Sequence, residues 1–180
     1  MKIYIALFRG INVGGNNILP MKELVTLLES LGLQQVKTYI QSGNAVFRST
    51  ADNILRLADT IRSEIKRRHG FEPCVLLMEI TEMEKAMAAN PFPEAVTEPN
   101  TLHLNFLSSI PVNPDLKGLE KLRSENERYE LKDKVFYLHA PDGIGRSKLG
   151  ANAEKLLGVL MTGRNWRTVS KILALAKENF

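Results

Sequence analysis

The sequence has a single cysteine, Cys74, among its 180 residues. One thiol cannot form an intrachain disulfide, and it excludes metal sites that need several cysteines. Cys74 begins the apolar stretch 74–78, so we expect a buried structural thiol rather than a nucleophile. No apolar run approaches membrane-spanning length, and the N-terminal run is too short for a signal peptide. We therefore expect a cytoplasmic protein without membrane contacts.

Neither sign of charge dominates the composition. The net charge is +4, and 44% of the residues are hydrophobic, which is enough to build a core and argues against disorder. The mild excess of positive charge does not identify a nucleic-acid binder. Its distribution is uneven, because residues 144–180 hold seven lysines and arginines against two acids. The positive charge is thus concentrated near the C-terminus.

Residues 9–17 read Arg-Gly-Ile-Asn-Val-Gly-Gly-Asn-Asn and separate an apolar run at 3–8 from a helix expected near Pro20. A strand followed by glycines and a helix can direct several backbone N–H groups at one anion. The spacing matches neither a P-loop nor the dinucleotide motif GxGxxG. Alternatively, the glycines permit a long turn and the asparagines bond to their own backbone. The candidate ligand-binding residues here are Arg9, Gly10, Asn12, Gly14, Gly15 and Asn16.

The first half of the chain predicts the order strand, helix, strand, strand, helix, strand. Apolar spacing indicates helices over residues 21–31 and 53–69, and β-rich runs at 36–40 and 45–47 flank a Ser-Gly-Asn turn. A further strand is expected at 73–80, followed by a short helix opened by a capping box at Thr81–Glu84. This order is typical of the ferredoxin-like split βαβ unit.

The second half predicts the same plan, because a strand at 102–107 precedes a helix capped at 113–115 and a hairpin turning at 132–133. Helices are expected at 152–160 and 165–177. We therefore predict an α+β fold of two consecutive ferredoxin-like halves packed together. The predicted organisation is residues 1–90, a proline-rich connection at 91–100, and residues 101–180.

The basic C-terminal region supplies a second candidate site. Arg164, Arg167 and Lys171 have the spacing of one helix face, and arginines near a helix start suggest an anion or an acidic side chain opposite them. A solvated basic face explains the pattern equally well, and Trp166 is expected to anchor the core. The further candidate ligand contacts are Ser42, Asn44, Lys148, Arg164, Asn165 and Arg167.

Evidence for catalysis is weaker than evidence for binding. The three histidines, His69, His103 and His139, are isolated in the sequence, so core or capping roles are favoured for each. Ser42 and Ser147 lack a nucleophile-elbow motif. We assign no nucleophile, metal site or cofactor, and whether the protein is an enzyme stays open.

Four segments together resemble a known family. They are the Arg9–Gly15 motif, residues 39–44 (Tyr-Ile-Gln-Ser-Gly-Asn), Asn-Pro-Phe at 90–92 and residues 162–168 (Thr-Gly-Arg-Asn-Trp-Arg-Thr). The chain resembles, over almost its whole length, the bacterial family called domain of unknown function 1697. The resemblance implies an α+β fold of two related halves and no particular activity. It suggests that the marked segments meet in space, around either a ligand or a structural junction.

The leading hypothesis is a binding protein whose cleft between the halves takes a small anionic, phosphate-bearing ligand. Alternatives are an enzyme acting on a phosphorylated metabolite, an RNA binder, and a structural or protein-interaction module without a ligand. RNA is not favoured, because the third strand lacks the aromatic residues of RNA-binding sheets. Ferredoxin-like sheets also have exposed edges and faces through which two copies of the chain can pair, so a homodimer is a further alternative.

Overall fold

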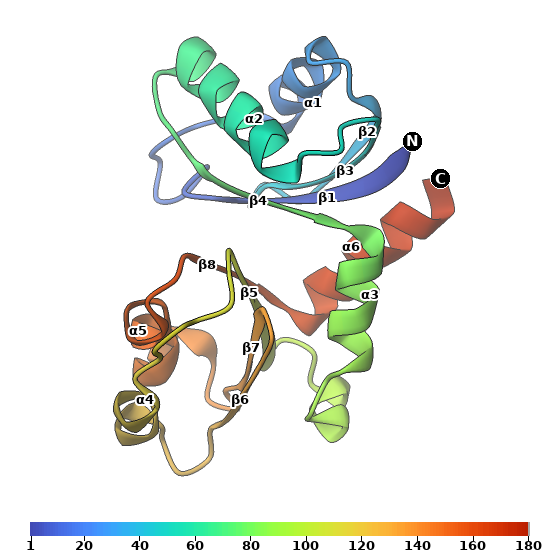
Figure 1. Ribbon diagram of the computed structural model, residues 1–180. Helices are drawn as coiled ribbons and strands as arrows, with labels where there is room; N and C mark the ends of the chain where they lie inside the picture. Colours follow the sequence, from blue (N-terminus) through green and yellow to red (C-terminus); the bar gives the residue numbers. More distant parts are fainter. Residues whose placement is uncertain (180) are drawn as a thin grey trace. The chain divides into compact units, whose positions relative to one another are not determined.

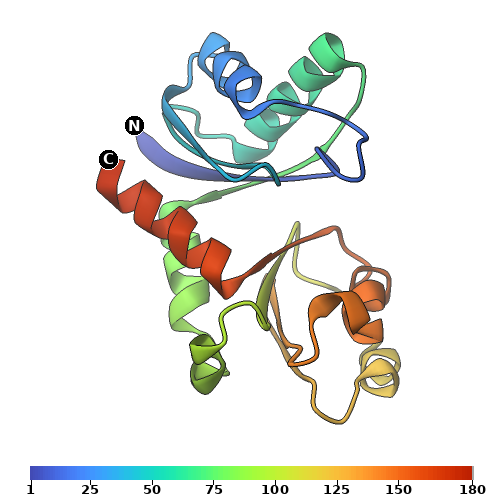
Figure 2. The ribbon, with the colours of Figure 1, turned by 180° about the vertical axis from the view of Figure 1, so that it is seen from behind.

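Eight strands form two separate four-stranded sheets in the computed structural model, which describes residues 1–179 (Figures 1 and 2). The chain divides into two units. The first comprises Met1–Lys85 together with the chain from Lys171 onward, and the second comprises Ala86–Ser170. Both boundaries fall inside helices, α3 (Ile80–Ala88) and α6 (Trp166–Asn179). The predicted division at 1–90, 91–100 and 101–180 consists of consecutive segments, whereas the first unit of the structure combines an N-terminal segment with the C-terminal part of α6.

The first unit has the split βαβ order that the sequence predicts. Its strands lie in the order β2-β3-β1-β4, and every neighbouring pair is antiparallel. This arrangement confirms the first ferredoxin-like half. The elements are β1 (Lys2–Arg9), α1 (Met21–Ser30), β2 (Gln34–Tyr39), β3 (Asn44–Ser49), α2 (Ile54–His69) and β4 (Cys74–Glu79).

Strand alternation explains the core of the first unit. Tyr4, Ala6 and Phe8 of β1 share one face, and the register places Tyr4 opposite Phe47 and Ala6 opposite Ala45. These buried residues pack with those of α1 and α2, which lie over the same face of the sheet (Figure 1). The core that positions the loop after β1 is therefore formed within this unit.

Local signals set the limits of the long helix α2. The Asn53 side chain accepts a hydrogen bond from the Arg56 N–H, and Gly70 ends the helix in the left-handed conformation. Both signals agree with the predicted helix. The capping box predicted at Thr81–Glu84 is wrong, because the Glu82 carboxylate instead accepts from the Glu79 N–H at 2.9 Å. Glu84 pairs with Lys177 at 2.8 Å.

The second unit repeats the topology. Its strand order is β6-β7-β5-β8, again antiparallel throughout, which confirms the duplicated architecture. The elements are β5 (Leu102–Leu107), α4 (Leu116–Leu122), β6 (Arg128–Lys132), β7 (Val135–His139), α5 (Lys148–Leu157) and β8 (Met161–Asn165). Phe136, Leu138, Leu149 and Ala153 are among the core residues on one face of this sheet.

The proline-rich segment packs on the other face of the second sheet. It forms the short 3₁₀ helix η1 (Pro93–Thr97), and Arg128 pairs with Glu94 while lying 4.7 Å from the centre of the Phe92 ring. Nearby, the buried Tyr137 hydroxyl donates to the Ala86 carbonyl at 2.6 Å. Burial raises the pKa of Tyr137 to about 12.

Two elements of the second unit differ from the prediction. Helix α5 begins at Lys148 rather than near Asn152, because the Ser147 side chain caps it by accepting from the Gly150 N–H. Strand β8 was not predicted, since its five residues include threonine, glycine, arginine and asparagine. Its pairing with β5, which places Thr162 opposite Phe106, supplies the stabilisation that its local sequence lacks.

Candidate functional site

The loop between β1 and α1 is a small hairpin. The Asn12 N–H donates to the Asn17 carbonyl and the Asn16 N–H to the Val13 carbonyl, both at 3.0 Å. Gly14 and Gly15, at the tip, have φ of 57° and 78°. Successive left-handed residues between two paired positions form the tight turn that favours glycine. The glycines therefore have the turn geometry expected from the sequence.

The Asn12 side chain holds this loop in place. Its amide oxygen accepts from the Leu19 N–H at 2.7 Å, and its amide nitrogen donates at 2.9 Å to the carbonyls of Leu19 and Gln41. Asn17 donates in the same way to the Gly10 carbonyl at 2.8 Å. These bonds match the structural interpretation of the asparagines. Asn12 can thus affect a ligand mainly through the shape of the loop.

The loop also packs against the turn between β2 and β3. The Phe8 N–H donates to the Gly43 carbonyl at 2.8 Å, and a Cβ on Gly43 would lie 2.5 Å from Ile11 Cδ1. The neighbouring Asn44 is buried and donates to the Tyr39 carbonyl at 2.9 Å and to the Ser42 hydroxyl at 3.3 Å. The structure thus brings the candidates of residues 9–16 together with Ser42 and Asn44 in one unit.

The tip of the loop is available for binding. Gly14 and Gly15 are exposed, and their N–H groups donate to no acceptor within residues 1–179. Two aliphatic side chains of the loop are exposed: Val13, next to the tip, is 65% exposed, and Ile18, after the last paired residue of the hairpin, is 63% exposed. Arg9, half-buried, ends the strand that leads into the loop. The loop and the end of β1 therefore offer backbone donors, one guanidinium and two apolar side chains.

Arg164 occupies a strand, not a helix. It is the fourth residue of β8, so the predicted helical face of Arg164, Arg167 and Lys171 is wrong. Burial lowers the pKa of Arg164 to about 10, which leaves its guanidinium charged at neutral pH. One of its nitrogens donates to the Gly163 carbonyl at 2.8 Å. A partly buried cation fits an anion contact better than a solvated basic face does.

The other predicted contacts of the second unit have different environments. Asn165 caps α6, because its side-chain oxygen accepts from the Thr168 N–H at 2.9 Å. Arg167 is exposed in the first turn of α6, and Lys148 is exposed at the start of α5. Trp166 is half-buried. Only Arg167 and Lys148 therefore present a freely solvated charge.

His103 is a buried histidine on the central strand β5. Its side chain is 8% exposed, and its Nε2 has no hydrogen-bond partner in the described chain. Burial lowers the pKa of His103 below the usual value near 6.5. The neutral imidazole is therefore the form that the folded protein prefers, as expected for a core residue rather than a catalytic one.

We expect the free energy of unfolding to fall as the pH drops below about 6.5, because the unfolded chain then binds a proton that the folded His103 resists. The contribution of neutral His103 to the free energy of unfolding is fully present above that pH, and it is lost as the pH falls through the lower pKa of the folded state. Urea unfolding at several pH values should show that the unfolding free energy of His103→Asn depends less on pH than that of the parent protein. The two slopes should differ by at most about 1.4 kcal/mol per pH unit. Equal pH dependence in both proteins would contradict this assignment.

The sequence did not point to a hollow on the helical side of the first unit. Lys22, Glu23 and Thr26 of α1 line it together with Arg68 and His69 of α2. The available signal was the basic run at the end of α2. It does not reveal which of those side chains turn toward α1, because the two groups are more than 40 positions apart in the chain.

No group of three histidine, cysteine or acidic side chains able to hold a metal is present among the described residues. Cys74 is half-buried at the start of the edge strand β4, rather than fully buried. Across residues 1–179, no helix combines the length and apolar character needed to cross a bilayer.

Comparison with known proteins agrees with the resemblance seen in the sequence. Residues 1–137 match a family model described as "Protein of unknown function (DUF1697)". A solved structure, the conserved bacterial protein SP0830 from Streptococcus pneumoniae, is similar with a TM-score of 0.74 and 26% sequence identity. The similarity covers 97% of this chain and 98% of that one. No curated protein matches the chain.

Proposed function

Because the chain belongs to this family, whose description assigns no function, we propose from the site itself that the protein binds a small anionic, phosphate-bearing ligand. In the first unit the ligand is bound by Arg9, by the N–H groups of the turn at Gly14 and Gly15, and by Ser42. Gly10, Asn12, Asn44 and the backbone of Asn16 hold these groups in position. In the second unit, Arg164, Asn165, Arg167 and Lys148 form a further set of anion contacts.

The observation that carries the proposal is the pair of unbonded N–H groups at the exposed tip of a hydrogen-bonded hairpin. Four side-chain hydrogen bonds of Asn12 and Asn17 hold the loop in one conformation, and Ile11 packs against Gly43 of the neighbouring turn. Its backbone donors at Gly14 and Gly15 nevertheless stay exposed. Donors fixed before binding need no ordering when an anion arrives, which favours affinity.

Titration calorimetry with inorganic phosphate, nucleotides and sugar phosphates tests this proposal. We expect at least one of these ligands to bind, and Arg9→Ala to weaken that binding about tenfold or more, because a charge-assisted hydrogen bond contributes roughly 1.5–3 kcal/mol. Lys37→Ala is the matched control, since it removes an exposed cation of the same unit. The double variant Arg164→Ala, Arg167→Ala tests the second unit.

Unchanged affinity in both arginine variants would overturn the proposed contacts. Turnover of a bound phosphate ester, lost in Arg9→Ala while the fold persists, would indicate an enzyme. An affinity for RNA with a steep dependence on salt would indicate nucleic acid, because each phosphate contact on a single strand adds about −0.7 to the logarithmic slope.

A second candidate function is a protein-interaction loop. It is favoured by the exposed Val13 and Ile18 of the loop and by Ile40, 48% exposed in the neighbouring turn. If no anion binds, the double variant Val13→Ser, Ile18→Ser tests this function. It should keep the stability of the parent protein and lose binding to the protein partner. A homodimer would appear as concentration-dependent mass in sedimentation experiments.

A further inference from the structure

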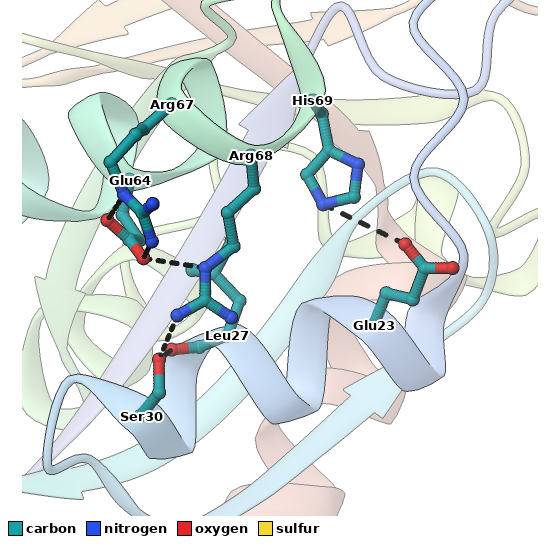
Figure 3. Close-up of polar contacts among 7 residues, drawn as sticks. All are labelled: Glu23, Leu27, Ser30, Glu64, Arg67, Arg68 and His69. Atoms are coloured by element: carbon teal, nitrogen blue, oxygen red, sulfur yellow. Dashed lines mark hydrogen bonds and ion pairs between the residues drawn. The ribbon is translucent and has the colours of Figure 1, made fainter.

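The hollow between α1 and α2 has a volume of about 320 Å³ and is lined by three basic side chains, Lys22, Arg68 and His69, with Glu23 and Thr26. Figure 3 shows Arg68 and His69 extending from the end of α2 toward α1. The volume is at the lower end of small-molecule sites. The hollow lies entirely within the first unit, and its side chains are separate from those proposed above.

Arg68 is held by both helices. Its Nε donates to Glu64 Oε1 at 2.6 Å, and one terminal nitrogen, Nη2, donates to the Ser30 hydroxyl at 2.7 Å (Figure 3). The Ser30 hydroxyl in turn donates to the Leu27 carbonyl at 2.6 Å. The other terminal nitrogen, Nη1, has no acceptor within residues 1–179. A guanidinium fixed in this way loses little freedom when its remaining donors bind an anion.

The remaining groups leave a positive balance. Lys22 is exposed and has no ion-pair partner among the described residues. Among the described residues, Glu23 is the only carboxylate that lines the hollow, and its Oε2 lies 3.8 Å from His69 Nε2, beyond hydrogen-bond distance. Glu64 accepts from both Arg67 and Arg68, which holds its pKa down at about 2. Arg67 and Arg68 share the Glu64 carboxylate, so these two arginines and Lys22 exceed Glu64 and Glu23 by one positive charge.

Helix-dipole stabilisation alone does not account for Arg68. Cations in the last turn of a helix are favourable wherever they point, and Lys66 and Arg67 fulfil that role with Glu72 and Glu64 as ion-pair partners. Arg68 is instead bonded across to Ser30 of α1, beside a lysine that has no ion-pair partner among the described residues. This arrangement offers several donors to one group with many acceptor oxygens.

We propose that this hollow is a second binding site, which takes the phosphate group of a small phosphate monoester or free phosphate. Arg68 Nη1 and the Lys22 ammonium contact the phosphate oxygens. Thr26 lines the hollow beside them, and its hydroxyl donates to the Lys22 carbonyl at 3.1 Å. The Glu23 charge is directed at His69. Phosphate suits these donors better than a carboxylate, since it presents more oxygens and a second negative charge.

The test is an NMR titration of the full chain with inorganic phosphate, at constant ionic strength set with chloride. We expect saturable shifts of the Lys22, Glu23 and Thr26 amides and of the Arg68 Nε–H. Arg68→Ala and Lys22→Ala should each weaken binding about tenfold. The matched control is Arg67→Ala. Like Arg68, Arg67 carries one positive charge and donates to Glu64, but it does not line the hollow.

Two more variants separate binding from folding. Arg68→Lys keeps the positive charge but loses the planar set of N–H donors of the guanidinium. This variant should bind phosphate more weakly than the parent protein while its amide spectrum shows that the fold is retained. Arg9→Ala should leave the Lys22 and Thr26 shifts unchanged, which distinguishes this site from the one proposed above. Shifts that do not saturate, or equal weakening by Arg67→Ala, would overturn the proposal. A phosphate monoester that binds more tightly than inorganic phosphate would identify the source of the phosphate group.

Discussion

A Gly43→Ala variant is expected to lose about 3 kcal/mol of unfolding free energy. The added Cβ would lie 2.5 Å from Ile11 Cδ1 and 2.8 Å from Phe8 Cβ, in a residue whose φ is 83°. Overpacking a buried site costs about 1–3 kcal/mol, and the left-handed backbone adds roughly 1–2 kcal/mol for a residue with a Cβ. Urea unfolding monitored by circular dichroism measures the loss.

Gly32→Ala is the control for backbone strain. Gly32 has a φ of 81°, and its Cβ would meet nothing within 4 Å. It should therefore cost only about 1 kcal/mol. If both alanines cost the same, then the packing of Gly43 against Ile11 does not stabilise the protein, and the loop and the turn are not held together as the structure indicates.

The second large effect is expected for Asn12→Ala, at about 3 kcal/mol. This change leaves the Leu19 N–H and the carbonyls of Leu19 and Gln41 without their side-chain partner. A buried group that loses its hydrogen bond costs about 1–3 kcal/mol, and Leu19 is fully buried. The left-handed φ of 52° at Asn12 adds strain to an alanine.

Asn16→Ala is the matched control in the same loop. The Asn16 side chain is exposed, and its contact with the Gly14 carbonyl, at 3.5 Å, is at the limit of a hydrogen bond. We expect a loss below about 0.5 kcal/mol. Chemical denaturation of the two variants side by side gives the comparison. Similar losses would show that the loop is not fixed by Asn12.

These variants also bear on binding. If the loop is shaped before the ligand arrives, Asn12→Ala should weaken any anion bound at the tip, even though its side chain has no free donor. A variant that unfolds more easily yet binds with unchanged affinity would indicate that ligand contacts order the loop. The comparison requires conditions in which both proteins remain folded.

The order of elements could be predicted from the sequence because the signals are local. Alternating and helical apolar spacings identified seven of the eight strands and the main helices, and Gly70 and Asn53 marked the ends of α2. Strand β8 was missed, since its stability comes from pairing with β5. That omission led to the wrong helical face for Arg164.

The sequence also indicated which loop is unusual, though not how its residues divide their roles. A string of glycines and asparagines is compatible with a ligand site or with a self-bonded turn. The structure shows that Asn12 and Asn17 bond within the first unit while Gly14 and Gly15 stay exposed. Which donors are satisfied depends on partners such as Gln41, 29 positions away.

By itself, the sequence determined the α+β class, the repeated split βαβ order and the positions of the glycine turn. Only the tertiary structure decided that Arg164 lies on an edge strand, that His103 is buried, and that Lys22 and Arg68 line one hollow. The physical reason is the range of the forces involved. Backbone propensity and apolar periodicity act over a few residues, whereas burial, charge pairing and the accessibility of a donor depend on segments that folding brings together.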